Sequence, residues 1–116
     1  MTSDHPAIPA PRWDELTPPE HAAHLHLLTR WVDQVLIPGY GDCGLRPCWP
    51  DHPRAVRELS TLRAEWRRIY DRPSPELAGA LTWHDRWLPG VEYRMDREFT
   101  DCRGGCRLTP RIRAVH

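Results

Sequence analysis

Two short segments of this chain carry residue types that bind metals. One is CWPDH, which contains Cys48 and His52, and the other is CRGGC, which contains Cys102 and Cys106. Zinc prefers thiolate and imidazole ligands, and it commonly takes them as two close pairs separated by a spacer. The pattern therefore predicts one structural zinc site that joins the two segments.

The local sequence favours convergence within each pair. Asp51 is a candidate N-cap for the helix that follows, which places His52 in its first turn and Cys48 in the turn before. The two glycines between Cys102 and Cys106 permit the positive φ angles that a short chelating loop requires. A metal held in this way joins the start of the second helix to the end of the chain.

Other assignments of these cysteines stay open at this point. Neither pair has the two-residue spacing of the strongest zinc motifs, so unliganded thiols and disulfides are the alternatives. Cys43 competes with His52, because a site of four thiolates is equally acceptable to zinc, and His116 is a further candidate ligand. No ligand position is obviously left for water, which disfavours a metal-dependent hydrolase.

The composition limits the size and the partners of the protein. A chain of 116 residues forms one domain, with a core small enough to benefit from a metal. Its sixteen basic residues are all arginine and are balanced by sixteen acids, so no general polyanion-binding surface is implied. Residues 1–51 carry three Arg and seven acids, and residues 52–116 carry thirteen and nine. An anionic partner is therefore expected to meet the second half.

The amino-terminal sequence predicts a cytoplasmic protein. MTSDHPAIPAPRWDE has acids and prolines where a secretory signal needs a basic start and an apolar run. No apolar stretch approaches the ~18 residues that a membrane span needs. In a reducing cytosol, thiols and metal ligands are more common than disulfides.

Hydrophobic periodicity predicts an all-α fold. Residues 1–15 lack this periodicity and are expected to form a flexible arm outside the core. Thr17, Pro18 and Glu20 form a helix-start signal, and Pro38 with Gly39 is expected to end that helix. The loop that follows contains Cys43 and Cys48 and is rich in glycine and proline.

Two or three more helices complete the predicted bundle. The second extends from Asp51 through Arg72, and the third from Ser74, as its cap, to about Leu88, where LPG ends it. Residues 91–99 fit a fourth short helix or a brief strand. The prediction is a small three- to four-helix bundle over residues 16–106 with an irregular Cys-containing loop and a carboxyl segment, followed by a basic tail at 107–116.

Aromatic and basic residues predict two candidate interaction surfaces. Trp31 and Trp66 lie on apolar helix stripes and are expected in the core. Trp83, Arg86 and Trp87 form a candidate patch for another protein. The alternative is a nucleic-acid surface on the second helix and the basic tail. Its candidate residues are Arg54, Arg57, Arg68, Arg103, Arg107, Arg111 and Arg113.

The sequence contains none of the common catalytic motifs. A phosphate-binding loop, a nucleophile elbow, a His-Glu-x-x-His motif and a deaminase signature are all missing. His84 and Asp85 are adjacent on a helix and therefore point in different directions, so they form no dyad. The prediction is a protein that is not an enzyme and has no small-molecule substrate.

A set of tryptophan-containing segments carries a family resemblance. The segments are Trp31 with PGYG at 38–41, CWPDHP at 48–53, LSTLRAEW at 59–66, WHDRWLP at 83–89 and FTDC at 99–102. Their order resembles an uncharacterised actinobacterial family of small plasmid- and phage-associated proteins, the domain-of-unknown-function 4913 family. The family's tryptophan doublet is reduced here to Trp49, and Cys106 stands where the family often has histidine. The resemblance implies an accessory protein of a mobile element or its host. It implies no particular activity, because the family has no established one.

Overall fold

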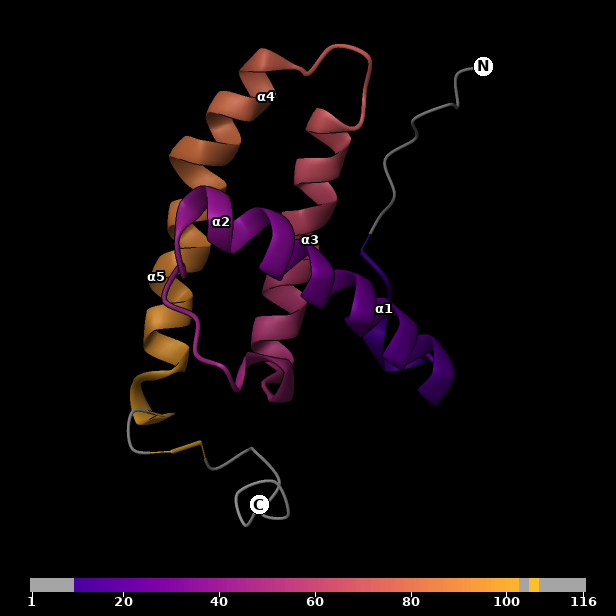
Figure 1. Cartoon of the computed structure of the whole chain (residues 1–116), viewed down its shortest axis with the longest axis vertical. Helices are drawn as coiled ribbons and strands as arrows, with labels where there is room; N and C mark the ends of the chain where they lie inside the picture. The colour runs from indigo at the N-terminus through magenta and orange to yellow at the C-terminus, as the bar shows by residue number, and fades with distance from the viewer. Residues whose placement is uncertain (1–9, 103–104, 107–116) are drawn as a thin grey trace.

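The computed structural model describes residues 10–102 and 105–106, and every regular element within them is helical (Figure 1). The predicted all-α fold is confirmed. In chain order the elements are a 3₁₀ turn Trp13–Glu15, α1 Pro18–Trp31, a π-helical segment Val32–Leu36, α2 Ile37–Tyr40, a 3₁₀ turn Trp49–Asp51, α3 Pro53–Tyr70, α4 Leu77–Thr82, a π-helical segment Trp83–Trp87, α5 Leu88–Glu98 and a 3₁₀ turn Thr100–Cys102. None of the helices among these residues is long and apolar enough to cross a membrane.

These elements join into three long helices. α1 continues through a π-helical segment into α2, and α4 continues in the same way into α5. α3 lies beside the α4–α5 helix, and the α1–α2 helix crosses both (Figure 1). The irregular segment between α2 and α3 therefore lies close to the lower end of α5, where the chain approaches its carboxyl end.

The proline–glycine pairs at 38–39 and 89–90 lie inside helices. The prediction that they end the first and third helices is wrong. A π-helical turn comes just before each proline, in which the Ile37 N–H donates to the Val32 carbonyl and the Leu88 N–H donates to the Trp83 carbonyl. Because this turn is wider than an α-helical turn, it relieves the clash between the proline ring and the preceding carbonyl groups.

The first helix start was predicted correctly. The Thr17 side chain accepts from the Glu20 N–H, and the Glu20 carboxylate accepts from the Thr17 N–H, so both halves of the capping box form. The residues 91–99 are helical up to Glu98 as part of α5, and the strand alternative is wrong.

The predicted boundaries of the other helices are partly wrong. Asp51 does not cap α3, because His52 occupies the N-cap position and makes no side-chain cap hydrogen bond. α3 ends at Tyr70 and not at Arg72. α4 starts at Leu77, and its N-cap residue is Glu76, which lies two residues after the predicted cap at Ser74.

One hydrophobic core fills the space between the three helices. Trp31 is buried and meets the half-buried Trp66 edge to face, with 6.0 Å between ring centroids, as core residues are expected to do. Trp13 is also buried, although it falls in the segment that was predicted to lie outside the core. Trp83 is fully buried, and its Nε1–H donates to the Leu62 carbonyl oxygen at 3.1 Å.

We predict that Trp83 and Trp87 contribute very differently to stability. Trp83→Phe removes a buried hydrogen bond and leaves a small cavity, so it is expected to lower the free energy of unfolding by about 2–3 kcal/mol. Trp87→Phe, at a position that is 48% exposed, is expected to change it by less than about 1 kcal/mol. Urea denaturation of both variants measures the difference, and equal losses would contradict the assigned core.

Candidate metal centre

The two predicted ligand pairs meet at one point in the fold. Cys48 and His52 come from the segment just before α3, and Cys102 and Cys106 come from the chain after α5. The four ligand atoms all lie within 4.8 Å of one another. This cluster, called the Cys₃His cluster below, can hold a metal ion.

A tight turn brings Cys48 and His52 together. In the 3₁₀ turn Trp49–Asp51, the Asp51 N–H donates to the Cys48 carbonyl and the His52 N–H donates to the Trp49 carbonyl. The turn reverses the chain, so the Cys48 thiol lies 3.5 Å from His52 Nε2. His52 is the N-cap residue of α3, whose first residue is Pro53. Proline is tolerated at this position because the first N–H groups of a helix have no partner within the helix.

A second turn supplies the other two thiols. The Cys102 N–H donates to the Phe99 carbonyl directly after α5, and the Gly105 N–H donates to the Cys102 carbonyl. Gly105 has a φ of +128°, which side-chain-bearing residues rarely adopt. The backbone can therefore fold back and return Cys106 to the cluster.

The spacing of the ligand atoms suits a tetrahedral ion. His52 Nε2 lies 3.5 Å from the Cys48 sulfur, 3.5 Å from the Cys102 sulfur and 3.1 Å from the Cys106 sulfur. Zinc bonds of about 2.3 Å to sulfur and about 2.05 Å to nitrogen, at tetrahedral angles, place nitrogen and sulfur roughly 3.5 Å apart. A small move of Cys106 brings all three distances to this value.

Glu98 orients the imidazole ring. Its Oε2 atom lies 2.8 Å from His52 Nδ1, so this nitrogen carries the proton and the Nδ1–H donates a hydrogen bond to the carboxylate. The lone pair of Nε2 then faces the three sulfurs. Carboxylate–histidine–metal arrangements of this kind fix the tautomer and raise the basicity of the ligand.

Glu98 was not among the residues predicted for the site. It lies four residues before Cys102, at the end of α5, and the ring of Phe99 next to it packs edge to face on the His52 ring. An acidic residue one helical turn before a candidate ligand was the only available signal. That signal is weak, because His52 lies 46 residues away in the chain.

Without a metal ion, the surroundings of the cluster favour protonated thiols. Burial, together with the neighbouring Cys106 and Cys102, raises the pKa of Cys48 to about 12, and burial also raises the pKa of Cys102. Burial lowers the pKa of His52, but its contacts with Glu98 and Cys106 outweigh this and raise it overall. A divalent cation reverses the effect on the thiols, because it stabilises several thiolates at once.

Cys43 is outside the cluster. It is buried, and its thiol faces the backbone carbonyl oxygens of Gly41 at 3.4 Å and Tyr40 at 3.9 Å. The structure therefore brings His52, and not Cys43, to the position of fourth ligand. The other candidate, His116, lies outside the described residues.

The predicted protein-binding patch is only partly at the surface. Trp83 belongs to the core, which is a correction of its predicted surface role, whereas Trp87 is half exposed and Arg86 is exposed. Trp87 lines a pocket of about 340 Å³ between α3 and α5, called the Trp87 groove below. Its other lining residues are Glu58, Thr61, Leu62, Glu65, Val91 and Arg94.

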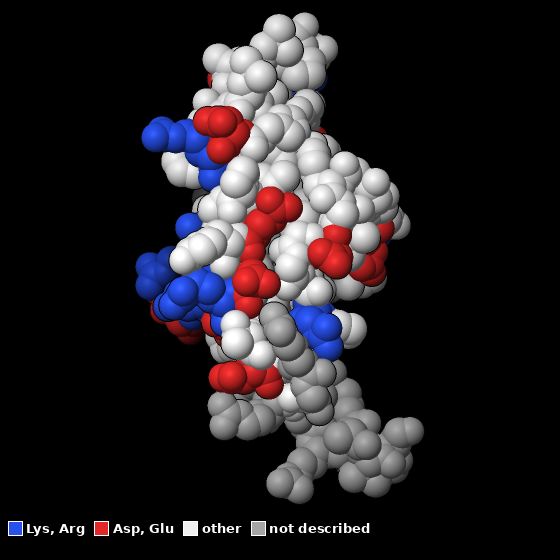
Figure 2. Space-filling view, turned by 90° about the vertical axis from the view of Figure 1, so that its left-hand side faces the viewer, with Lys and Arg blue, Asp and Glu red and all other residues white. Residues whose placement is uncertain are grey.

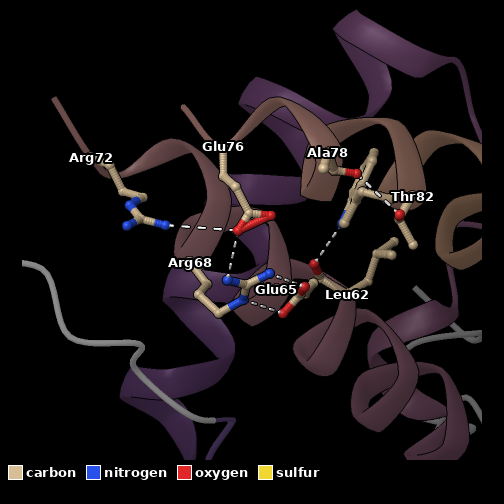
Figure 3. Close-up of polar contacts among 8 residues, drawn as sticks. Leu62, Glu65, Arg68, Arg72, Glu76, Ala78 and Thr82 are labelled. Atoms are coloured by element: carbon tan, nitrogen blue, oxygen red, sulfur yellow. Dashed lines mark hydrogen bonds and ion pairs between the residues drawn. The ribbon is translucent and has the colours of Figure 1, made fainter. Parts of the chain in front are cut away.

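The charged residues mostly alternate in sign. Figure 2 shows groups of basic and acidic side chains lying beside each other on one face, and wide uncharged areas between these groups. Arg68 is neutralised by Glu65, at 2.7 Å, and lies 3.6 Å from Glu76 (Figure 3). It therefore contributes little to a surface for nucleic acid.

Arg54 and Arg57 are exposed and line an open hollow with Glu58 and Thr61. The remaining predicted members of the nucleic-acid surface lie outside the described residues. They are Arg103, Arg107, Arg111 and Arg113, of which the last three belong to the predicted tail at 107–116.

Comparison with known proteins adds nothing to this geometry, because no family model, no curated protein and no solved structure matches the chain. The resemblance to the actinobacterial family therefore stays a prediction. The chemistry of the site rests on its own residues.

We predict that Glu98→Gln weakens metal binding without abolishing it. The neutral amide still accepts a hydrogen bond from His52, but it no longer raises the basicity of the ring. The zinc affinity is expected to fall by about 10–100-fold, measured by competition with a chromogenic chelator, with the stoichiometry unchanged. Asp96→Asn, which removes an exposed acid from the same helix, is the matched control. Equal effects of the two variants would contradict the role of Glu98.

Proposed function

We propose that this chain is a non-enzymatic binding module whose fold is held by one structural zinc ion. The observation that carries the proposal is the convergence of His52 Nε2 and three cysteine sulfurs within 4.8 Å. Soft thiolates with one imidazole in a tetrahedral arrangement are the ligand set of structural zinc sites.

The ligand count supports a structural site over a hydrolytic one. Catalytic zinc sites use three protein ligands and keep the fourth position for water. In the Cys₃His cluster, four protein atoms are available for four positions. A metal-dependent hydrolase is therefore the least supported reading.

The position of the cluster explains what the metal would stabilise. The segment 41–48 contains no long helix, and in the part of the chain after α5 that the structure describes, one 3₁₀ turn, Thr100–Cys102, precedes Cys106. A metal joins these two irregular segments to each other and to the start of α3. In small zinc peptides, metal binding supplies on the order of 10 kcal/mol of folding free energy.

The proposed partner is another protein that uses the Trp87 groove. Trp87 supplies exposed apolar surface, and Glu58, Glu65 and Arg94 are the charged residues of the lining. Half-exposed tryptophans next to a pocket are typical energetic centres of protein interfaces. A cytoplasmic location and a role in a mobile element or its host are part of this proposal, and they rest on the amino-terminal sequence and on the family resemblance.

Nucleic-acid binding is the second candidate. It is favoured by Arg54 and Arg57, which are exposed next to each other at the start of α3. Phosphate contacts of this kind make affinity fall steeply with salt.

We predict one zinc per chain in protein purified without a metal-affinity tag. Elemental analysis and native mass spectrometry measure the ratio. Cys102→Ser combined with Cys106→Ser is expected to lose the zinc and to lose helicity on mild heating, because two of the four ligands are gone. Cys43→Ser, a change at another buried cysteine, is expected to keep the full zinc content. A wild-type chain without metal, or a double variant that retains it, would overturn the structural-zinc proposal.

We predict that partner binding depends on Trp87 and not on other exposed apolar residues. Tagged wild type, Trp87→Ala and Leu81→Ala are compared as baits by quantitative mass spectrometry. Leu81 is 72% exposed on the same continuous helix and does not line the groove, so Leu81→Ala is the matched control. A protein retained by wild type and Leu81→Ala but lost at least about 10-fold with Trp87→Ala identifies the partner. Recovery that nuclease or higher salt abolishes, and that needs Arg54 and Arg57, points instead to nucleic acid.

A further inference from the structure

The Cys₃His cluster has a buried side and an accessible side. His52 and Cys102 are 3% and 6% exposed, respectively. Cys48 and Cys106 are partly exposed. Because small oxidants reach exposed sulfur first, these two cysteines are the ones open to reaction.

The two accessible sulfurs are also close enough to join. They lie within 4.8 Å of each other, and each is a neighbour of His52 Nε2. Neither cysteine lies in a long helix, since Cys48 precedes a 3₁₀ turn and Cys106 follows one. A disulfide needs a sulfur–sulfur distance of about 2.05 Å, so joining these two sulfurs requires a local shift of one of the two cysteines.

We propose that the metal centre is also an oxidative modification site, in which hydrogen peroxide or a related hydroperoxide joins Cys48 to Cys106 and releases the zinc. The inference rests on the proposed structural zinc. It adds that an oxidant controls whether the Cys₃His cluster holds its zinc.

The reaction balances with peroxide as the only oxidant. The thiolate sulfur of one of the two cysteines attacks a peroxide oxygen, the O–O bond breaks, and hydroxide leaves, so this sulfur becomes a sulfenic acid. The second thiolate attacks that sulfur, the S–O bond breaks, and a second hydroxide leaves as the disulfide forms. The two sulfurs together lose two electrons, the peroxide gains two, and two protons from solvent complete two water molecules.

The product retains only two metal ligands, His52 and Cys102. Two ligands bind zinc far more weakly than four, so the ion leaves for solvent or for another site. The new covalent bond keeps Cys106 next to Cys48, while Cys102 and the last turn after α5 lose their metal bond to α3. The oxidised chain therefore keeps one connection between the two segments and loses the other.

Stepwise oxidation of the zinc-loaded full chain tests the inference. Zinc release is followed with a chromogenic chelator, and the cysteine pairs are mapped by peptide mass spectrometry. We expect one zinc released per peroxide consumed, a mass about 2 Da lower for the metal-free chain, a Cys48–Cys106 disulfide, and full recovery with a thiol reductant and zinc. Zinc that remains bound at excess peroxide, or a disulfide that contains Cys102, would overturn the proposal.

Cys106→His is the decisive variant. Histidine keeps a zinc ligand at this position but forms no disulfide, so zinc is expected to bind at one per chain and to be released by peroxide at least about 10-fold more slowly. Cys43→Ser, which leaves the cluster intact, is expected to respond like wild type. Release of zinc from Cys106→His at the wild-type rate would contradict the assigned Cys48–Cys106 pair. If this variant does not bind zinc, disulfide mapping in wild type and in Cys43→Ser still decides which cysteines pair.

The zinc content before oxidation separates the two proposals. A chain without zinc overturns both the structural-zinc proposal and this inference. A chain that holds zinc and keeps it under peroxide leaves the structural site in place and overturns the oxidative modification alone.

Discussion

The hydrogen bond between His52 and Glu98 links the start of α3 to the end of α5, at the point where the Cys₃His cluster lies. His52 starts α3 and Glu98 ends α5, so one 2.8 Å contact fixes the lower ends of two neighbouring helices. It also sets the tautomer of the ring and directs Nε2 at three sulfurs. Without this orientation Nε2 could carry the proton, and it would then have no lone pair to donate to a metal ion.

The Cys-containing loop depends on the same region. Gly44 has a φ of +75° and lies so close to α5 that an added Cβ would sit 3.4 Å from the backbone of Glu92 and Asp96. Cys43 beside it is buried, and Cys48 at the other end of the loop belongs to the Cys₃His cluster. The loop therefore crosses α5 in contact with it. Cys43 holds one end of the loop by packing in the core, and Cys48 holds the other end as a member of the cluster.

The helix-start signal at Thr17 was predicted correctly, whereas contacts between residues distant in the chain were not. The capping box at Thr17 and Glu20 forms because all of its atoms lie within one helical turn. The four cluster residues could be proposed because zinc commonly takes thiolate and imidazole ligands as two close pairs, although Cys43 and His116 were open alternatives. Glu98 could not, because only the packing of α5 against α3 brings it to His52.

The prolines show why the helix ends were harder to predict. Pro38 and Pro89 stop an ideal α-helix, but a π-helical turn before each lets the helix continue. Pattern analysis with a fixed period of 3.6 does not allow for such turns. Trp83 and Trp87 show the related limit, since they lie one turn apart and yet one is fully buried and the other half exposed. Their different burial is decided by where α3 covers the helix, and that depends on tertiary packing.

The small size of the chain explains why the core and the cluster stabilise different parts of the structure. Apolar side chains hold the three helices together, and these contacts act where helices lie along one another. The segment 41–48 and the described residues 99–102 and 105–106 contain too little regular structure to bury much apolar surface of their own. A small domain can order such segments only with bonds that are strong for each residue involved, and metal–thiolate bonds meet this need. In the proposed zinc site, two of the four ligands would be the partly exposed Cys48 and Cys106, which is why the proposed oxidation would act on both segments.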